Sequence, residues 1–486
     1  MTKINYSEYQ KTIFSQIKEG KGNLVINALA GSGKTSTLIK SLESVDPKLK
    51  TLMTAFNSKI AAELKTKAPG HVEVFTLHQI GLRAVGKAMS GIVVDNNKLY
   101  SITTDYLKKT FPKLPIQAIL GPLQQAVSLA KGFLLSSPDE IEGIIEQYNL
   151  DWGQDMDAVD FVRSTLAILK KCKENTKILD FDDMLWFTEV YKIPLTQYDR
   201  VFVDEAQDLN KVQRQMVLKM IKPGTARKPP GRCFVACDRF QSIYQFRGAD
   251  EHSVENFIQD LDAKQLDLPI SYRCPKSVIK EAQAYVPNIR AADDAIEGKV
   301  LEISLIDLFK TAQKGDFILS RYNRPLVDMA LYFLKKSIPA RIQGRDIGVS
   351  LSGIIKKCKG KTIKSVYEFI DKWEKSEEER LLGKDKALEL SKDKAECLRL
   401  FAEGCNNVFE VLQAIDRMFV DKGSNEFIIF SSVHQAKGLE SDRIFLFEDT
   451  FRQSSQQEKN IHYVAITRAK KELFYVNYYS ERKDLP

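Results

Sequence analysis

The chain has 486 residues, 43% hydrophobic and 28% charged, which gives it room for more than one domain and the composition of a soluble globular protein. No apolar run approaches the roughly 20 residues of a membrane span, and the polar stretch 1–10 lacks the apolar core of a secretion signal, so we expect an intracellular protein. The net charge of +8 permits binding to a polyanion without requiring it. The seven cysteines are scattered without metal-binding spacing, and neither a disulfide framework nor a metal–sulfur cluster is expected.

The first part of the chain alternates short apolar runs with helical patterns. Such runs are typical of strands buried on both faces of a parallel sheet. They occur at residues 24–30, 51–54, 72–75, 201–203 and 232–236, with helical patterns at 58–67 and 210–221. The alternation predicts a doubly wound α/β domain. Between about 86 and 178 strand runs are lacking and Pro and Gly interrupt the pattern, as at Gly121-Pro122, which predicts a helical insertion.

A second α/β pattern follows Arg273. Strands are predicted at 316–320, 427–430, 443–447 and 473–476, and a helix at 326–336. Residues 347–424 between them are helical and highly charged, and the mixed-sign run 372–394 is typical of a solvated helix face. The expected fold class is therefore α/β, with two parallel-sheet domains that each carry a helical insertion.

A glycine loop follows the first apolar run and precedes a helical pattern, which is the context of a phosphate-binding loop. Glycines let backbone N–H groups close around phosphates at a helix N-terminus. Lys34 would reach the β- and γ-phosphates, and the Thr35 hydroxyl would hold Mg²⁺. The first glycine of the usual pattern is replaced by Ala28. The expected nucleotide contacts are Ala30, Gly31, Ser32, Gly33, Lys34, Thr35 and Ser36.

Two acidic residues, Asp204 and Glu205, close the run 201–203. A carboxylate at the end of a strand beside a phosphate loop can orient a metal ion, so Asp204 is expected to join Thr35 at Mg²⁺. Glu205 would polarise the attacking water as a general base. The alternative is an exposed acidic turn without a catalytic role.

The segment 241–249 places a glutamine, two aromatic residues and an arginine close together. Aromatic rings suit stacking on unpaired bases, because every base has a π-face. Gln241 would read the phosphate, while Tyr244 and Phe246 would stack on bases and Arg247 would tie the two. The segment predicts that ATP chemistry is coupled to single-stranded nucleic acid.

Nine motifs in order give the chain a resemblance to superfamily 1A helicases of the UvrD/Rep/PcrA type. The sequence at Asp204–Asp208 is also similar to that in the helicase part of the F-box DNA helicase. The motifs are Gln10, Gly31–Thr35, Ala55–Lys59, Phe75–His78, Asp204–Asp208, Gln241–Ala249, Ser271–Arg273, Val433–Glu440 and Tyr463–Ala469.

The resemblance implies two RecA-like domains with ATP between them. The implied boundaries are 1–85 with 179–272 for the first RecA-like domain, 86–178 for its helical insertion, 273–346 with 425–486 for the second RecA-like domain, and 347–424 for a small insertion, which is reduced relative to UvrD-like enzymes.

The resemblance also implies roles for single residues. Gln10 would read the adenine edge, Tyr272 would stack on the adenine ring, and Glu440 would contact the nucleotide sugar. Arg273 and Arg468 would act as arginine fingers, and Gln241 would sense the γ-phosphate. Several relatives carry an arginine where this chain has Ser36, and bacterial relatives often have tryptophan at Phe246 and glycine at Cys237 and Gln245.

Eight residues are expected to contact DNA. For Phe56 and Phe246, ordinary core packing is the alternative. The expected contacts are Phe56, Asn57, Thr76, His78, Tyr244, Phe246, Arg247 and His434.

The predicted function is an ATP- and Mg²⁺-dependent DNA helicase that moves 3′→5′ on single-stranded DNA and acts at single-strand/duplex junctions. A translocase that strips proteins from DNA and a nucleotide-gated binding module remain open alternatives. Replication, recombination or repair proteins are expected partners and a membrane is not. The expected location is the cytoplasm, at the nucleoid or, for a viral protein, in the host cytoplasm.

Overall fold

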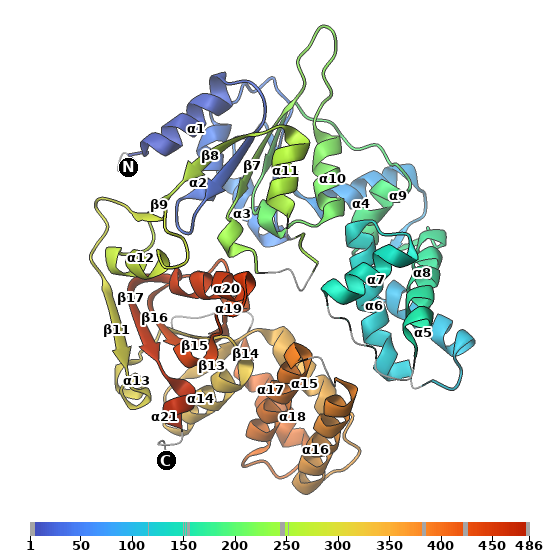
Figure 1. The fold of residues 1–486 in the computed structure, drawn as a ribbon, viewed down its shortest axis with the longest axis vertical. Helices are drawn as coiled ribbons and strands as arrows, with labels where there is room; N and C mark the ends of the chain where they lie inside the picture. The colour runs from blue at the N-terminus through green and yellow to red at the C-terminus, as the bar shows by residue number, and fades with distance from the viewer. Residues whose placement is uncertain are drawn as a thin grey trace. The chain divides into compact units, whose positions relative to one another are not determined.

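The computed structural model describes residues 5–114, 116–148, 150, 152, 156–243, 248–250, 252–381, 385–420 and 426–482. The chain forms two compact units, Met1–Pro269 and Ile270–Pro486, each considered by itself (Figure 1). Tyr272 and Arg273 therefore belong to the second unit. The division of each unit into a sheet domain and an insertion stays a prediction.

The first unit is built on a parallel sheet of six strands in the order β3-β2-β6-β7-β1-β8. Five of the strands were predicted from their short apolar runs, although β3 is an edge strand that contains the half-buried Glu73. The edge strand β8 was missed, since most of its residues are polar and exposed. The strands are β1 (Leu24–Ala28), β2 (Thr51–Ala55), β3 (Val72–Thr76), β6 (Arg200–Val203), β7 (Arg232–Cys237) and β8 (Lys264–Leu268).

Helices cover both faces of this sheet. Met53 and Phe202 pack on one face with α1, α2 and α3, while Leu52 and Val203 pack on the other with α4, α9, α10 and α11. This arrangement is the doubly wound fold that the alternating pattern predicts. The helices are α1 (Glu8–Glu19), α2 (Lys34–Leu42), α3 (Ser58–Lys67), α4 (Leu77–Ala88), α9 (Asp183–Val190), α10 (Lys211–Met220) and α11 (Ser253–Leu261).

The stretch from 86 to 178 is helical, with two corrections. A short parallel pair, β4 (Val93–Val94) with β5 (Ile178–Leu179), frames it, and α6 continues through Pro122 where punctuation was expected. Two buried lysines join it to the start of α9: Lys98 pairs with Asp183 at 2.7 Å, and Lys131 with Asp180 at 2.6 Å. The helices are α5 (Lys98–Thr110), α6 (Ile116–Phe133), α7 (Pro138–Gln147) and α8 (Ala158–Glu174).

The second unit contains a parallel sheet of seven strands in the order β11-β17-β16-β12-β15-β13-β14. The predicted strands at 316–320, 427–430, 443–447 and 473–476 form its centre. The remaining strands of this sheet were missed because β14 has only two residues, β11 is largely exposed at the edge, and β13 mixes Arg341 and Gln343 with two apolar residues. The strands are β11 (Lys299–Ile303), β12 (Phe317–Ser320), β13 (Ala340–Gln343), β14 (Phe419–Val420), β15 (Ile428–Ser432), β16 (Ser441–Phe447) and β17 (Ala469–Val476), with a separate pair β9 (Ile270–Ser271) and β10 (Arg290–Ala291).

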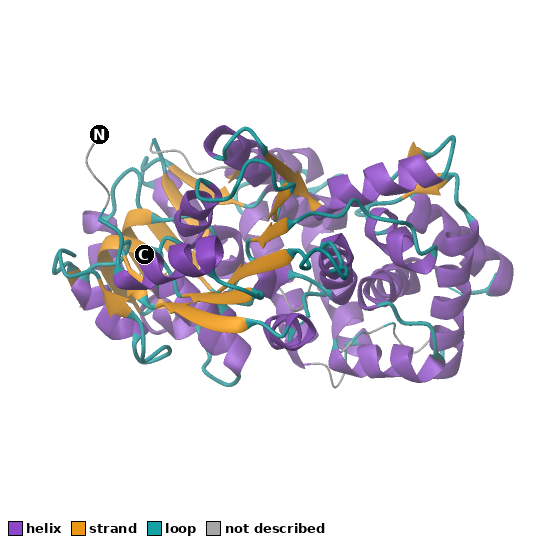
Figure 2. Ribbon diagram, turned by 90° about the horizontal axis from the view of Figure 1, so that it is seen from above, coloured by secondary structure: helices purple, strands orange, loops and turns teal. Residues whose placement is uncertain are grey.

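Helices and strands alternate along much of the chain, as the colours of Figure 2 show, and in the second unit α14 packs on β12, β13 and β15. The charged stretch after 346 is helical as predicted, and its apolar residues join one hydrophobic cluster with β12, β13 and β15. The helices are α12 (Lys276–Ala282), α13 (Leu305–Thr311), α14 (Asn323–Lys335), α15 (Arg345–Ile355), α16 (Ile363–Arg380), α17 (Asp385–Ala402), α18 (Val408–Met418), α19 (Val433–Ala436), α20 (Gln456–Ile466) and α21 (Tyr478–Glu481).

Candidate active site

Most of the candidate residues of the first unit follow strands that end at one edge of its sheet. Ligands of open α/β sheets bind outside the carboxyl ends of the strands. The order β3-β2-β6-β7-β1 places the phosphate-loop and acidic residues behind β1, β6 and β7, and the candidate DNA contacts behind the neighbouring β2 and β3. The residues at this edge are Gly31–Thr35 after β1, Asp204 and Glu205 after β6, Asp238 after β7, Phe56 and Asn57 after β2, and Thr76 and His78 at the end of β3.

The phosphate loop leads from β1 into α2. Gly33 has a φ of 75° and precedes the first residue of α2, and its carbonyl accepts a hydrogen bond from the Thr37 amide at 2.8 Å. This left-handed backbone suits glycine, because a Cβ is disfavoured there. Within this segment Ala30 and Ser32 are buried and Ser36 is exposed. The loop thus points a helix N-terminus at the edge of the sheet, which is an arrangement that suits phosphate.

Lys34 lies between two carboxylates. Its ammonium is 2.6 Å from Glu205 Oε2 and 3.5 Å from Asp204 Oδ1. Burial lowers the pKa of Lys34, but the charges of Glu205 and Asp204 outweigh it and raise the pKa above the ordinary value. Burial also raises the pKa of Asp204, against the opposing effect of Lys34.

Thr35 and Asp204 fit a magnesium ion. The Thr35 hydroxyl donates a 2.8 Å hydrogen bond to Asp204 Oδ2, so two hard oxygen donors stand side by side at the entrance to the loop. Magnesium is commonly held by one or two protein oxygens together with substrate phosphates and water. The pair matches that donor set.

A hydrogen-bonded relay leads from Glu205 to Gln241. Gln207 donates through Nε2 to Glu205 and accepts through Oε1 from the Asp238 amide at 3.0 Å. Asp238 Oδ2 accepts from Gln241 Nε2 at 2.6 Å. Gln207 and Asp238 were not among the predicted site residues, although Asp238 directly follows the predicted strand β7 and precedes Gln241 by three positions.

Two features of the relay are typical of functional sites. Glu205 has a φ of 57°, a left-handed conformation that is costly for a residue other than glycine. Asp238 is 1% exposed, and burial raises the pKa of its carboxyl to about 6, against the hydrogen bond from Gln241. The carboxylate is therefore charged at neutral pH and becomes protonated in mildly acidic solution.

We expect Asp238→Asn to lower kcat about tenfold, because an amide presents a donor to the Gln241 amide in place of a charged acceptor. Activity of the wild type should fall as the pH drops through about 6, where Asp238 takes up a proton. Steady-state hydrolysis across pH tests this, and the variant should lose that acidic limb.

Asp316→Asn is the matched control, because Asp316 is also buried with a pKa raised to about 6 but lies in the second unit. An acidic limb that survives in Asp238→Asn, or disappears equally in Asp316→Asn, would contradict a positioning role for Asp238.

Gln10 lies beside the loop. Its Nε2 donates to Thr37 Oγ1 at 3.0 Å, and its Oε1 accepts from the Ser7 amide at 3.1 Å in the capping box of α1. The residue is 5% exposed. The structure therefore places Gln10 against the start of α2, where the nucleotide role assigned to it stays a prediction.

The candidate DNA contacts of the first unit differ in exposure. The Phe56 ring is 42% exposed, which excludes simple core packing for this side chain. Asn57 and Thr76 cap the N-termini of α3 and α4. His78 stacks on Phe181, with ring centroids 3.8 Å apart, and burial lowers its pKa to about 4. Phe181 was not predicted, and its ring is 53% exposed.

Tyr244, Phe246 and Arg247 lie outside the described residues. The chain leaves the relay through Ile243, which is buried, and is described again at Gly248. A Cβ at Gly248 would stand 3.0 Å from Leu129 Cδ2, so the backbone passes close against α6.

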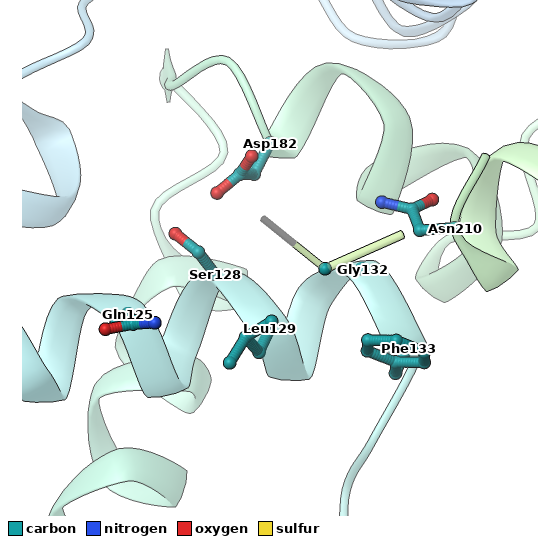
Figure 3. A pocket seen from close by; sticks show the side chains of 8 residues that line it. Gln125, Ser128, Leu129, Gly132, Phe133, Asp182 and Asn210 are labelled. Atoms are coloured by element: carbon teal, nitrogen blue, oxygen red, sulfur yellow. The ribbon is translucent and has the colours of Figure 1, made fainter. Parts of the chain in front are cut away.

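A cleft of about 120 Å³ opens beside Gly248 (Figure 3). Figure 3 shows Ser128 and Leu129 of α6 on one side and Asp182 and Asn210 across from them. The segment that follows the relay therefore returns next to a partly polar hollow on α6.

The second unit gathers three of its candidate residues. Arg273 Nε donates to Glu440 at 2.6 Å, and Arg273 Nη1 donates to the Thr467 carbonyl at 3.3 Å. Arg468 is 1% exposed and donates to the carbonyls of Val464 and Leu439.

The two remaining candidates of this unit have different surroundings. The Tyr272 ring is 47% exposed beside Arg273, as a stacking surface requires. His434 lies in the short helix α19 and is half-buried. The structure thus brings Lys34, Thr35, Asp204 and Glu205 together in the first unit and Arg273 and Glu440 together in the second, while the roles assigned to these residues stay predictions.

A parallel sheet whose first strand leads through a glycine loop into a helix defines the P-loop class of α/β proteins. Residues 9–262 match the UvrD/REP helicase N-terminal domain, and residues 356–481 match the UvrD-like helicase C-terminal domain. The chain belongs to the UvrD/REP helicase family.

Three curated relatives illustrate its range. The chain is 24% identical to F-box DNA helicase protein 1 of Schizosaccharomyces pombe, across 97% of this chain and 57% of that protein. It is 26% identical to F-box DNA helicase 1 of Gallus gallus, across 97% and 49%, and 27% identical to the ATP-dependent DNA helicase PcrA of Bacillus subtilis, across 56% and 38%. The matches therefore cover only part of each relative's own length.

Within the described ranges, no helix has both the length and the apolar character needed to cross a membrane.

Proposed function

We propose that the chain is an ATP-dependent DNA helicase that uses Mg²⁺ and moves 3′→5′ along single-stranded DNA. The observation that carries this proposal is the cluster of Lys34, Thr35, Asp204 and Glu205 with the relay to Gln241, at the edge of a sheet that also bears exposed aromatic side chains. The names of the relatives, all DNA helicases, support the substrate.

ATP hydrolysis requires that Lys34 exchange partners. Its ammonium contacts Glu205 at 2.6 Å, and in the reaction it would contact the β- and γ-phosphates instead. That exchange frees the Glu205 carboxylate to accept a proton from the attacking water. Thr35 and Asp204 would hold the magnesium ion, which neutralises charge on the phosphates.

The second unit would supply further positive charge. Arg273 and Arg468 would stabilise the transferring phosphate, an effect worth about 10³–10⁵ in rate for arginine fingers in other systems. Arg273 would then exchange Glu440 for phosphate, and Glu440 would be free to meet the sugar. Gln10 and Tyr272 would hold the base.

Coupling to DNA would run through the relay. Gln241 would sense the γ-phosphate, and a shift of its side chain would move Asp238, Gln207 and Glu205 through the hydrogen bonds of the relay. The same shift would act along the chain on the segment that contains Tyr244, Phe246 and Arg247. The exposed rings of Phe56 and Phe181 add stacking surfaces, each worth about 1–3 kcal/mol per base. The remaining candidate contacts to the DNA strand are Asn57, Thr76, His78 and His434.

Polarity and unwinding are tested with tailed duplexes. A duplex with a 3′ single-stranded tail should be unwound with ATP and Mg²⁺, while one with a 5′ tail should not. Hydrolysis stimulated by single strands without separation of either duplex would instead identify a translocase, and hydrolysis indifferent to single strands would refute the proposal.

A further inference from the structure

Five lysines stand within nine residues where α15 leads into α16, and all five are exposed. No acidic residue occurs between Asp346 and Glu368 in the sequence. Positive charge is therefore concentrated at this end of the two helices. The five residues, which we call the lysine cluster, are Lys356, Lys357, Lys359, Lys361 and Lys364.

The lysine cluster differs from the charged surface further along α16. There Arg399 pairs with Asp371 and Glu374, and Lys392 with Glu378. Within the part of the chain that the structure describes, no such ion pair reaches the lysine cluster. The nearby carboxylate of Glu410 accepts hydrogen bonds at the start of α18. Like charges held together repel each other, and a bound polyanion would relieve that repulsion.

An exposed aromatic residue lies at the same end of these helices. Thr362 pairs with Asn407 in an isolated bridge, and the Ile363 amide donates to the Asn406 carbonyl at 3.1 Å. These interactions bring the start of α18 beside the start of α16. Phe409, in the first turn of α18, is 66% exposed.

We propose that the lysine cluster and Phe409 form an accessory site for single-stranded DNA. Lysines neutralise backbone phosphates whatever the sequence, and an exposed ring stacks on an unpaired base. A duplex would leave the ring unused, because its bases are already stacked. This proposal depends on the proposed helicase function in one respect only, which is that the bound single strand is DNA.

The test compares binding of the full-length chain to a long thymidine oligonucleotide and to a blunt duplex over a range of salt concentrations. One variant replaces the five lysines of the cluster by glutamine, and a second is Phe409→Ala. A matched control replaces five exposed lysines elsewhere in the same unit, so that both glutamine variants carry a net charge of +8 − 5 = +3. The control lysines are Lys310, Lys335, Lys372, Lys375 and Lys392.

The cluster variant should bind the oligonucleotide with a shallower salt dependence. The slope should fall by about 0.7 for each lysine that neutralises a phosphate in the wild type, and by about 3.5 if all five lysines do so. Phe409→Ala should bind about fivefold more weakly or worse with an unchanged slope, because stacking involves no counterion. An equal change in the control, or weaker binding of the duplex alone, would overturn the proposal. ATP hydrolysis with saturating single strands reports separately on the motor and should persist in all variants.

Discussion

Glu205→Gln should abolish DNA-stimulated ATP hydrolysis, with a rate lower by about 10²–10⁴, the usual contribution of a general base. The amide cannot take a proton from water, yet it retains the shape of the side chain and an oxygen that can accept from Gln207. Phosphate release with saturating single strands measures the loss, and binding of a fluorescent ATP analogue should change little.

Glu189→Gln serves as the control for this experiment. Glu189 pairs with Lys219 on the partly exposed surface of the same unit, away from the phosphate loop. Its replacement should leave hydrolysis within a factor of about two, since neither Glu189 nor Lys219 is a candidate site residue. Turnover of Glu205→Gln near the wild-type rate would remove Glu205 from the mechanism.

Lys34→Ala should lose both tight ATP binding and hydrolysis while the chain remains folded. A hydrogen bond to a charged group is worth about 1.5–3 kcal/mol, so the affinity for ATP should fall about 10- to 150-fold. The variant also leaves the carboxylates of Asp204 and Glu205 without the neutralising ammonium. Their negative charge then repels the phosphates of ATP and lowers its affinity further. Titration of a fluorescent ATP analogue and phosphate release measure the two effects.

Lys40→Ala is the matched control for that loss. Lys40 lies on the same helix, α2, but forms an exposed pair with Glu43. Its removal should alter neither ATP affinity nor turnover. Tight ATP binding by Lys34→Ala would show that the loop holds phosphate through its backbone alone.

The central strands were predictable because burial on both faces leaves a continuous apolar run, as in β6 and β7. Exposed edge strands were not predicted, since the largely polar or exposed sequences of β8 and β11 do not distinguish an edge strand from a loop. Gly121-Pro122 was expected to interrupt the helical pattern, but Pro122 stands within the 18-residue helix α6. Local residue preferences do not reveal packing against neighbouring helices, and that packing decides such cases.

The order of strand, glycine loop and helix around Lys34 was predictable, because the left-handed backbone at Gly31 and Gly33 favours glycine. Asp238 and Gln207 were not predicted as site residues, because their place in the site depends on hydrogen bonds between segments that lie apart in the sequence. Phe181 escaped for the same reason: only its stack on His78 distinguishes it from any other phenylalanine.

The position of β6 in the sheet fixes how far the acidic turn lies from the candidate DNA contacts and from the phosphate loop. β6 lies directly between β2 and β7, and neighbouring strands are spaced about 4.8 Å apart. The turn at Asp204 and Glu205 is therefore one strand spacing from the chain that continues into Phe56 and Asn57, and two spacings from the phosphate loop. The turn that carries the acidic pair and the segment that carries Phe56 are therefore neighbours through adjacent strands, and the segment that follows Gln241 does not lie between them in the sheet order.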